Sequence, residues 1–464
     1  MDLRSYYGDP HVRRRMREFL GGPSDGEATC AYLCRCDSAD GGVHRHGSER
    51  LDAFLEAGWE VGRSLWDHEG LIAHLDIEYV NYDYPGEAIK DPQRAFRIQQ
   101  PLVDAIEEVL ADYGVSALHL LTGRGHHFVW RIPYGTPAAS SLVAVGRMPR
   151  HMALTNATIR SPRGDQLPVE ACRGHAGLGL VMERLSHRFV EKAAPKCEIP
   201  VELTDVRVGP GERGREGLSI DLSEYGDPVH TRMIRLPFSA YLKPWLKPGL
   251  FSPDQHAELP LLFAVPQHEF DTRAAIDVMR DPERARDLAR RVSARIPDGS
   301  DGTRRLIEDY RDSPLARFHD WYYDHQPEAP ERWAETYDTL DLDRLPPCVA
   351  ESVRRPNDVL LQPAGIRRLV ATLWADGWHP RDVAGLIRSK YERDHGWGGR
   401  WYYYDAATRA DFYTRLFASW IAVGNDELVD YNCQSEKEKG LCARPFGDCD
   451  LTDWRRRALE RRWT

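Results

Sequence analysis

The chain has 464 residues, a formal net charge of −10, 42% apolar residues and 29% charged residues. This composition is typical of a soluble globular protein of two or three domains. No run approaches the roughly 20 apolar residues that span a bilayer, so we expect no membrane segment. The negative net charge argues against binding of nucleic acid over the whole surface, but a local basic groove can still bind a phosphate backbone.

The number of cysteines is nine, which is odd. The first residues lack the basic, apolar and small-residue order of a signal peptide. We therefore expect a cytoplasmic protein with reduced thiols. Clusters of cysteines are then better explained as metal ligands than as disulfides.

The first half of the chain mixes predicted strands and helices. Residues 11–20 are expected to be helical, 71–80 (LIAHLDIEYV) to be a buried strand, and 96–113 to be a helix that ends at Gly114. SALHLLTGRGHHFVWRIP predicts a strand, a tight glycine turn and a second strand, and a helix is expected at 173–190. PVELTDVRVGPGERGREG predicts a strand with a loop, and LSIDLSEY and TRMIRLPFSAYL predict two further strands.

The second half is predominantly helical in pattern. Residues 252–345 are charged and broken by segments such as RIPDGSDG, and amphipathic helices such as AGIRRLVATLWADG follow LPPC. The sequence therefore predicts an α+β protein. We expect a catalytic domain with a mixed or antiparallel sheet at 1–250, a helical connecting region at 251–344, and a mostly helical C-terminal domain at 345–464.

Two acids, Asp76 and Glu78, interrupt the apolar strand at 71–80. Successive side chains of a strand alternate faces, so these carboxylates share one face while Leu75, Ile77 and Tyr79 point into a core. Two carboxylates held close together repel each other unless a cation lies between them, and a divalent metal ion is the usual cation. A solvated strand face is the alternative, and this stretch alone favours it.

The segment LTGRGHHFVW places Gly123, Arg124 and Gly125 in a turn between two apolar strands. Glycines permit positive φ and the close approach of a ligand to the backbone. A histidine that follows such a turn is placed to meet a phosphate or a metal-bound group. A simple hairpin turn also explains the motif.

A third acid, Asp221, lies between apolar residues in SIDLSEYGDPVHTRMIRLPFSAYLK. Arg232, Arg235 and Lys243 follow it. A metal–nucleotide site needs this combination, because carboxylates hold divalent ions and cationic side chains hold a triphosphate.

Together, these three stretches resemble the archaeo-eukaryotic primase superfamily, with agreement in order and spacing from residue 74 to residue 243. Asp76 and Glu78 match its paired acids, and TGRGHH matches its second motif. The resemblance implies a nucleotidyltransferase in which Asp76, Glu78 and Asp221 bind two Mg²⁺ or Mn²⁺ ions. It also implies a set of nucleotide-binding residues: His127, Arg124, Arg232, Arg235, Ser239 and Lys243.

Two details complicate this match. Tyr241 stands where many members of the superfamily have histidine between the matching Ser and Lys. His126 precedes His127, so a shift of one residue would exchange them. The two histidines face opposite sides of a strand, and only one can serve.

Four cysteines form a second candidate site in the C-terminal domain. Eight residues separate Cys433 from Cys442, six separate Cys442 from Cys449, and Cys348 lies 85 positions before Cys433. Four thiolates gathered by the fold suit either zinc or a [4Fe–4S] cluster, and the spacing does not choose between them.

The PPC and GLC sequences around these cysteines resemble the C-terminal domain of the archaeal and eukaryotic large primase subunit. This resemblance implies a [4Fe–4S] cluster in a helical domain that helps to start synthesis, with zinc as the alternative. The two resemblances cover roughly residues 65–250 and 345–450. They imply a fused small-plus-large primase, like the primase–polymerases of archaeal plasmids and viruses.

Other features have weaker indications. Further candidate zinc ligands are Cys30, Cys34, Cys36, His44 and His46, although C-x3-C-x-C is unusual spacing for zinc, and buried or loop thiols explain it equally well. Cys172 and Cys197 are expected to be structural. The aromatic and Arg-rich stretch 398–413 is compatible with base stacking, but such aromatics are more often core residues. The tail DWRRRALERRWT is locally basic and is compatible with a solvated helix.

We therefore expect a metal-dependent DNA primase and polymerase that makes primers on single-stranded DNA from dNTPs or NTPs, with a replicative helicase as a candidate partner. One alternative is a polymerase that extends or repairs ends without priming, which the large-subunit-like domain argues against. Another is a non-catalytic nucleic-acid-binding subunit of a replication complex, which the presence of all three acids argues against.

Overall fold

The chain divides into two compact units in the computed structural model, which describes residues 3–21, 28–35, 44–204, 215–226, 232–246, 251–256, 258–267, 271–393, 405–444 and 449–463. The first unit comprises Met1–Met148, Leu154–Val206 and Glu216–Ile307. The second comprises Pro149–Ala153, Arg207–Arg215 and Glu308–Thr464. The expected connecting region, 251–344, is thus shared between the two units.

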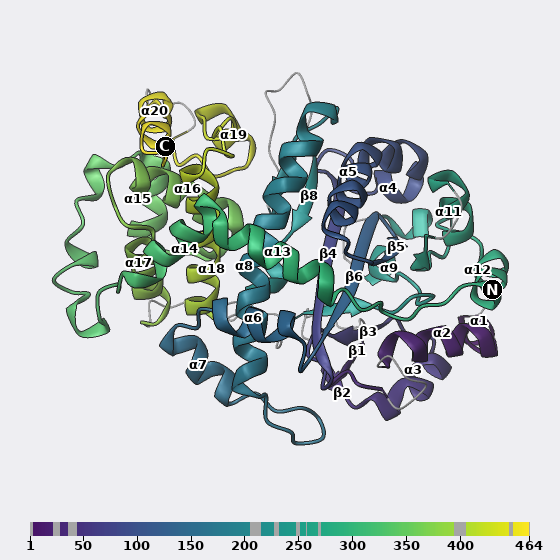
Figure 1. Cartoon of the computed structure of the whole chain (residues 1–464). Coiled ribbons are helices and arrows are strands. Elements are labelled where there is room, and N and C mark those ends of the chain that lie inside the picture. Colours follow the sequence, from purple (N-terminus) through teal and green to yellow (C-terminus); the bar gives the residue numbers. More distant parts are fainter. Residues whose placement is uncertain are drawn as a thin grey trace. The chain divides into compact units, whose positions relative to one another are not determined.

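Two sheets form the framework of the first unit (Figure 1). The larger has the order β10 (Val265–Pro266), β5 (Leu118–Thr122), β6 (Gly125–Pro133), β4 (Gly70–Asn81), β8 (Glu216–Asp221) and β7 (Val201–Leu203). The smaller has the order β2 (His44–His46), β1 (Leu33–Arg35), β3 (Val61–Ser64) and β9 (Met233–Arg235). Neighbouring strands are antiparallel except for β7 and β8, which are parallel.

Two long helices, α5 (Pro92–Tyr113) and α8 (Val169–Ala193), pack on one face of the larger sheet. Helix α5 begins after Asp91, whose carboxylate accepts a hydrogen bond from the Arg94 N–H, and it ends at Gly114 in the left-handed conformation (φ 64°). The face of β4 beneath these helices is apolar, because Leu75 and Ile77 are fully buried and Tyr79 nearly so. This face is the core that the alternation in β4 predicts.

Shorter helices complete the first unit: α1 (Leu3–Tyr7), α2 (Pro10–Leu20), α3 (Leu51–Ala57), α4 (Glu87–Lys90), α6 (Pro137–Val145), α9 (Lys243–Leu246), α10 (Pro253–His256), α11 (Thr272–Met279) and α12 (Pro282–Arg291). Helices α7 (Arg150–Ala157) and α13 (Ser300–Asp312) each contain residues assigned to both units.

The second unit is helical, and its described residues contain no strand. Its helices are α14 (Pro314–Asp324), α15 (Pro347–Arg354), α16 (Pro363–Ala375), α17 (Pro380–Tyr391), α18 (Ala406–Ala422), α19 (Cys433–Glu438) and α20 (Thr452–Glu460). Helices α14 to α17 each begin with proline, whose missing N–H is not needed in the first turn. Helix α18 is buried on almost every side and forms the centre of this unit.

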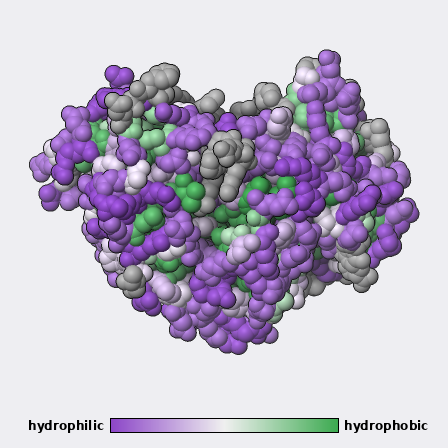
Figure 2. Space-filling model, turned by 90° about the horizontal axis from the view of Figure 1, so that it is seen from above, coloured by the Kyte–Doolittle hydropathy of each residue, from purple (hydrophilic) through white to green (hydrophobic). Residues whose placement is uncertain are grey.

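The predicted fold class, α+β with a helical C-terminal part, is confirmed. One predicted strand is wrong over most of its length, because only Met233–Arg235 of TRMIRLPFSAYL is a strand. Pro237 cannot donate to a ladder, and Phe238 has φ 66°, so the chain turns there. No helix among the described residues is both long and apolar enough to cross a membrane, and the face in Figure 2 is hydrophilic over most of its area.

Candidate active site

Three residues predicted from the sequence lie in one row across the larger sheet. Asp76 on β4 is paired with Asp221 on β8 on one side and with His127 on β6 on the other. His127 Nε2 lies 3.4 Å from Asp76 Oδ1. Glu78 is two residues further along β4 on the same face, opposite Gly125 and Ser219. The fold thus brings together the three acids and the histidine that were predicted from separate motifs.

The carboxylates of Asp76, Glu78 and Asp221 bring several negative charges close together on this face of the sheet. Burial alone would raise the pKa of Asp76, but His127, His74 and Arg124 together hold it well below its usual value. Burial raises the pKa of Asp221, Arg232 opposes that rise, and the charge of Asp76 adds to it. Asp76 Oδ1 is buried and accepts no hydrogen bond. Two opposed carboxylates, one of them with a buried oxygen that lies 3.4 Å from the His127 ring and accepts no hydrogen bond, have the donor chemistry that suits a divalent cation.

The acids are near one another without forming a preformed metal cage. In the described part of the chain, no group of three or more His, Cys, Asp or Glu side chains is arranged to enclose a metal ion. Glu78 is instead paired with Arg124, at 2.5 Å between Oε2 and Nη2. The donor chemistry of Asp76, Glu78 and Asp221 fits Mg²⁺ or Mn²⁺, and Arg124 would compete with such an ion for Oε2 of Glu78.

The register decides between the two adjacent histidines. His126 points toward α5, and its ring packs 5.3 Å from the ring of Phe96 on that helix. Its Nδ1 lies 2.9 Å from Nε2 of His119 on β5. His127 lies on the face that carries Asp76. Burial lowers the pKa of His127 while Asp76 opposes that shift. Of the two, His127 is the histidine placed to act with the acids.

The glycines of the β5–β6 turn are explained by close packing rather than by positive φ, which neither Gly123 nor Gly125 adopts. A Cβ at Gly125 would lie 1.8 Å from the Ile77 carbonyl oxygen, and one at Gly123 would lie 2.2 Å from the Tyr241 ring. The two glycines therefore let the hairpin sit against β4 and against Tyr241. The predicted backbone freedom is wrong, although the tight turn itself is present.

The predicted phosphate-binding residues come from the segment after Asp221. Arg235, on β9, is held by Glu60, with Nε and Nη2 lying 2.7 and 2.6 Å from Oε1. Its guanidinium lies 4.5 Å from the centre of the Tyr241 ring. Arg235 also contributes to the lowered pKa of His127, so the smaller sheet brings this cation close to the row of acids.

The remaining members of that set occupy different surroundings. Ser239 is fully buried, and its hydroxyl accepts a hydrogen bond from the Val61 N–H at 2.9 Å. Arg232 donates to the Ser223 hydroxyl at 2.6 Å. Lys243 is the first residue of α9. Arg232 therefore lies close enough to lower the pKa of Asp221, and Arg235 close enough to lower that of His127. Ser239 instead stabilises the loop.

Sequence reasoning missed a buried group beside the row. His74, on the same face of β4 as Asp76, lies edge-on to His127, with ring centres 4.6 Å apart. His74 Nδ1 contacts the carboxylate of Glu224, and the Tyr225 hydroxyl donates to the His74 carbonyl at 2.6 Å. Burial raises the pKa of Glu224 to about 7, against the opposing effect of His74. The period-two spacing of residues 74, 76 and 78 is the signal that could have found His74.

Among the described N-terminal zinc candidates, the histidines are not brought together with Cys34. Cys34 pairs with Arg45, whereas His44 and His46 pair with Arg35 and Leu33, so the histidines lie on the other face of this ribbon. Cys30 and Cys34 are buried, and burial raises the pKa of their thiols to about 11 and about 12. Cys36 lies outside the described residues. In the stretch 398–413, residues 398–404 also lie outside, and Phe412 and Tyr413 belong to the core of α18.

The four C-terminal cysteines are neighbours in the second unit. The Cys433 thiol donates to the Cys449 carbonyl at 3.3 Å. Burial raises the pKa of Cys348 to about 12, Arg368 opposes this, and Cys442 and Cys449 add to it. Burial raises the pKa of the Cys433 thiol, and Cys449 and Cys442 add to that rise. These mutual effects place the thiols near one another, but among the described residues no group of three or more of them is arranged to hold a metal ion.

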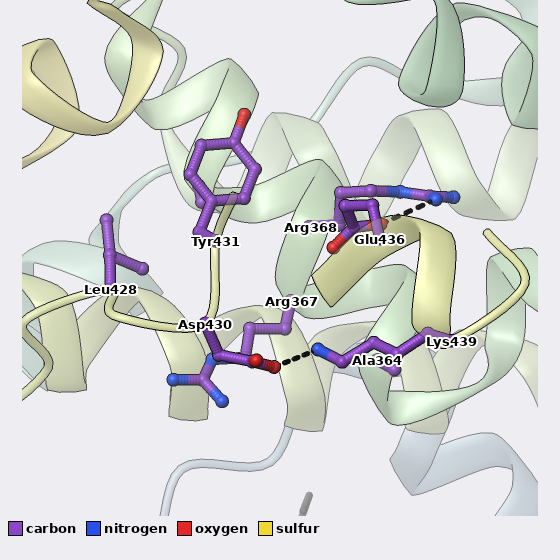
Figure 3. A pocket seen from close by; sticks show the side chains of 9 residues that line it. Ala364, Arg367, Arg368, Leu428, Asp430, Tyr431, Glu436 and Lys439 are labelled. Carbon is purple, nitrogen blue, oxygen red and sulfur yellow. Dashed lines mark hydrogen bonds and ion pairs between the residues drawn. The ribbon is translucent and has the colours of Figure 1, made fainter. Parts of the chain in front are cut away.

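Two ion pairs line a small pocket beside α16 and α19 (Figure 3). Arg368 points toward Glu436 at 3.0 Å and also donates to the Leu441 carbonyl, and Lys439 points toward Asp430. The cavity that they line has a volume of about 10 Å³, enough for one water molecule. This pocket is too small for a nucleotide, and the Arg368–Glu436 ion pair beside it connects α16 to α19.

No family model matches the chain, and a search of curated proteins finds no similar protein. The resemblance to primases therefore depends on the three motifs and on the PPC and GLC sequences around the C-terminal cysteines.

Proposed function

We propose that the chain is a template-directed nucleotidyltransferase that synthesises primers on single-stranded DNA from dNTPs, NTPs or both. The observation that carries this proposal is the row Asp221–Asp76–His127, with Glu78 beside it on one face of the sheet. The residues of this row come from three separate motifs, and Asp76 and Asp221 are 145 positions apart in the sequence. A solvated strand face does not account for an acid that is paired across the sheet with a second acid on one side and with a buried histidine on the other.

Asp76, Glu78 and Asp221 would hold two divalent ions. Such ions, when bound, activate a 3′-hydroxyl and stabilise a pyrophosphate leaving group. His127, Arg124, Arg232, Arg235, Ser239 and Lys243 form the nucleotide-binding set. The charged members would contribute electrostatically, because charges in a site with little water interact more strongly than charges at the surface. Ser239, whose hydroxyl accepts from the Val61 N–H, would contribute by holding the loop.

The second unit is proposed to hold a [4Fe–4S] cluster through Cys348, Cys433, Cys442 and Cys449, with zinc as the alternative. The mutual electrostatic influence of these thiols supports a shared site. In this proposal the helical unit grips the template and the initiating nucleotide, and a replicative helicase is a candidate partner.

The test is synthesis on unprimed single-stranded DNA with Mg²⁺ or Mn²⁺, compared with extension of a supplied primer. We expect products from the unprimed template. Extension without priming would instead support a polymerase that acts on existing ends. Binding of DNA with neither reaction would support a non-catalytic subunit.

A further inference from the structure

A buried carboxylate that no motif predicted connects to the nucleotide-binding set. Glu60 immediately precedes β3 and is 1% exposed. Its Oε1 accepts from Arg235, and its Oε2 accepts from the Leu242 N–H at 2.6 Å. Glu60 therefore holds a guanidinium and the backbone just before Lys243 at the same time.

The next residue extends this connection. The Val61 N–H donates to the Ser239 hydroxyl at 2.9 Å, and the Val61 carbonyl accepts from the Leu236 N–H at 3.0 Å. The Glu60–Val61 corner thus contacts residues 235, 236, 239 and 242. All of these belong to the segment that carries the predicted phosphate-binding residues.

The segment held by this corner is strained. Phe238 is fully buried and has φ 66°, a left-handed conformation that is rare for a bulky residue. Its N–H donates to the Ala264 carbonyl. Such conformations persist where the surroundings fix them, and they concentrate at functional sites.

A second buried carboxylate of the first unit provides a comparison. Asp67 is fully buried and pairs with Arg63 and Arg131, whose side chains are 0% and 2% exposed. The side chain of Arg235 is 14% exposed, and its ring partner Tyr241 packs against the Gly123 turn. The Asp67 network leads from Arg131 to Glu69, away from the predicted nucleotide-binding residues, whereas the Glu60 network leads to Arg235 and to the backbone before Lys243.

We propose that Glu60 is a positioning residue for the triphosphate subsite, because it fixes the plane of Arg235 against Tyr241 and the backbone that leads to Lys243. The ligand class is a nucleoside triphosphate, and this inference rests on the proposed function. A glutamine at position 60 would present an N–H₂ group to one of the two donors, so it cannot hold both.

The test is equilibrium binding of a fluorescent dATP analogue in the presence of Mn²⁺ to the full-length wild type, Glu60→Gln and Asp67→Asn. Melting temperatures are measured in parallel. Both variants lose a buried partner of arginine, so both should melt earlier. We expect only Glu60→Gln to weaken nucleotide binding, by about tenfold or more.

Equal affinities of Glu60→Gln and wild type, or equal weakening in Asp67→Asn, would overturn the inference while leaving the proposed function in place. A wild type that does not bind the nucleotide would overturn both. If Glu60→Gln does not fold, Glu60→Asp decides: it keeps the charge but is too short to reach both donors, so wild-type affinity in that variant would contradict the inference.

Discussion

Asp76 and Asp221 lie directly opposite each other on the adjacent strands β4 and β8. Like charges in this arrangement destabilise a sheet. Nearby cationic and histidine side chains outweigh burial at Asp76, but the pKa of Asp221 stays raised by burial and by the charge of Asp76, against the effect of Arg232. An arrangement that costs stability is expected where function requires it. We therefore regard this pair as the structural core of the proposed metal site.

The first prediction concerns the stability that the protein loses because Asp76 and Asp221 face each other. Asp221→Asn removes one of the opposed charges but keeps an oxygen that can accept the Ser223 N–H, which Asp221 Oδ1 accepts at 2.8 Å. We expect the free energy of unfolding without metal to rise by about 0.5–1 kcal/mol, while nucleotide incorporation falls by about 10²-fold or more. Urea unfolding and primer extension measure the two effects. A variant that is less stable and fully active would contradict this view.

The second prediction separates the adjacent histidines. His127→Ala should reduce nucleotide incorporation by about 10²-fold, because the side chain is lost from the face that carries Asp76. His126→Ala should lower the free energy of unfolding by about 1–3 kcal/mol, because it removes the contacts with His119 and Phe96. It should retain activity at temperatures where it is folded. The opposite pattern would mean that the register of β6 is wrong by one residue.

The third prediction is a pH dependence of stability. Burial raises the pKa of Asp67, but Arg63 and Arg131 outweigh burial and hold it below its usual 3.8. A carboxyl group with a depressed folded-state pKa stabilises the protein above its unfolded-state pKa, and this contribution is lost as the pH falls through the folded-state value. Asp67→Asn should therefore cost about 3 kcal/mol near neutral pH.

That difference from wild type should shrink below about pH 3.8. Urea unfolding of both proteins at a series of pH values measures it. A difference that grows as the pH falls would show that burial, rather than the two arginines, dominates at Asp67.

The fourth prediction concerns the C-terminal cysteines. Cys348→Ser should lose most of its bound metal when purified without oxygen, whereas Cys197→Ser, a half-buried cysteine of the first unit, should keep it. Metal analysis and the visible absorption spectrum measure the outcome. Zinc without iron in the wild type would show that the site holds the alternative metal, zinc. The absence of both metals would contradict a metal site here.

Local patterns predicted the elements that position the site. The alternation of LIAHLDIEYV gave the face of β4, and the glycine turn gave the β5–β6 hairpin, because both signals involve residues close in sequence. The apolar run TRMIRLPFSAYL continued past the true end of β9, since Pro237 and the left-handed Phe238 stop a strand that hydrophobicity alone extends.

The supporting residues could not be predicted in this way. Glu60 contacts Arg235, and Glu224 contacts His74, across 175 and 150 positions. Glu60 belongs to no motif, and Glu224 lies within the third stretch without being one of its predicted site residues; a glutamate in a sequence is usually a surface residue. The choice between His126 and His127 likewise depended on the register of β6 against β4, which only the fold supplies.

The central claim is that the acid-bearing face of β4 is a catalytic metal site. The most direct measurement is incorporation of labelled nucleotide on single-stranded DNA with Mn²⁺ by the wild type and by the Asp76→Ala/Glu78→Ala double variant, with melting temperatures of both. We expect the wild type to incorporate nucleotide and the double variant to lose incorporation while it remains folded. Incorporation at the wild-type rate by a folded double variant would contradict the claim.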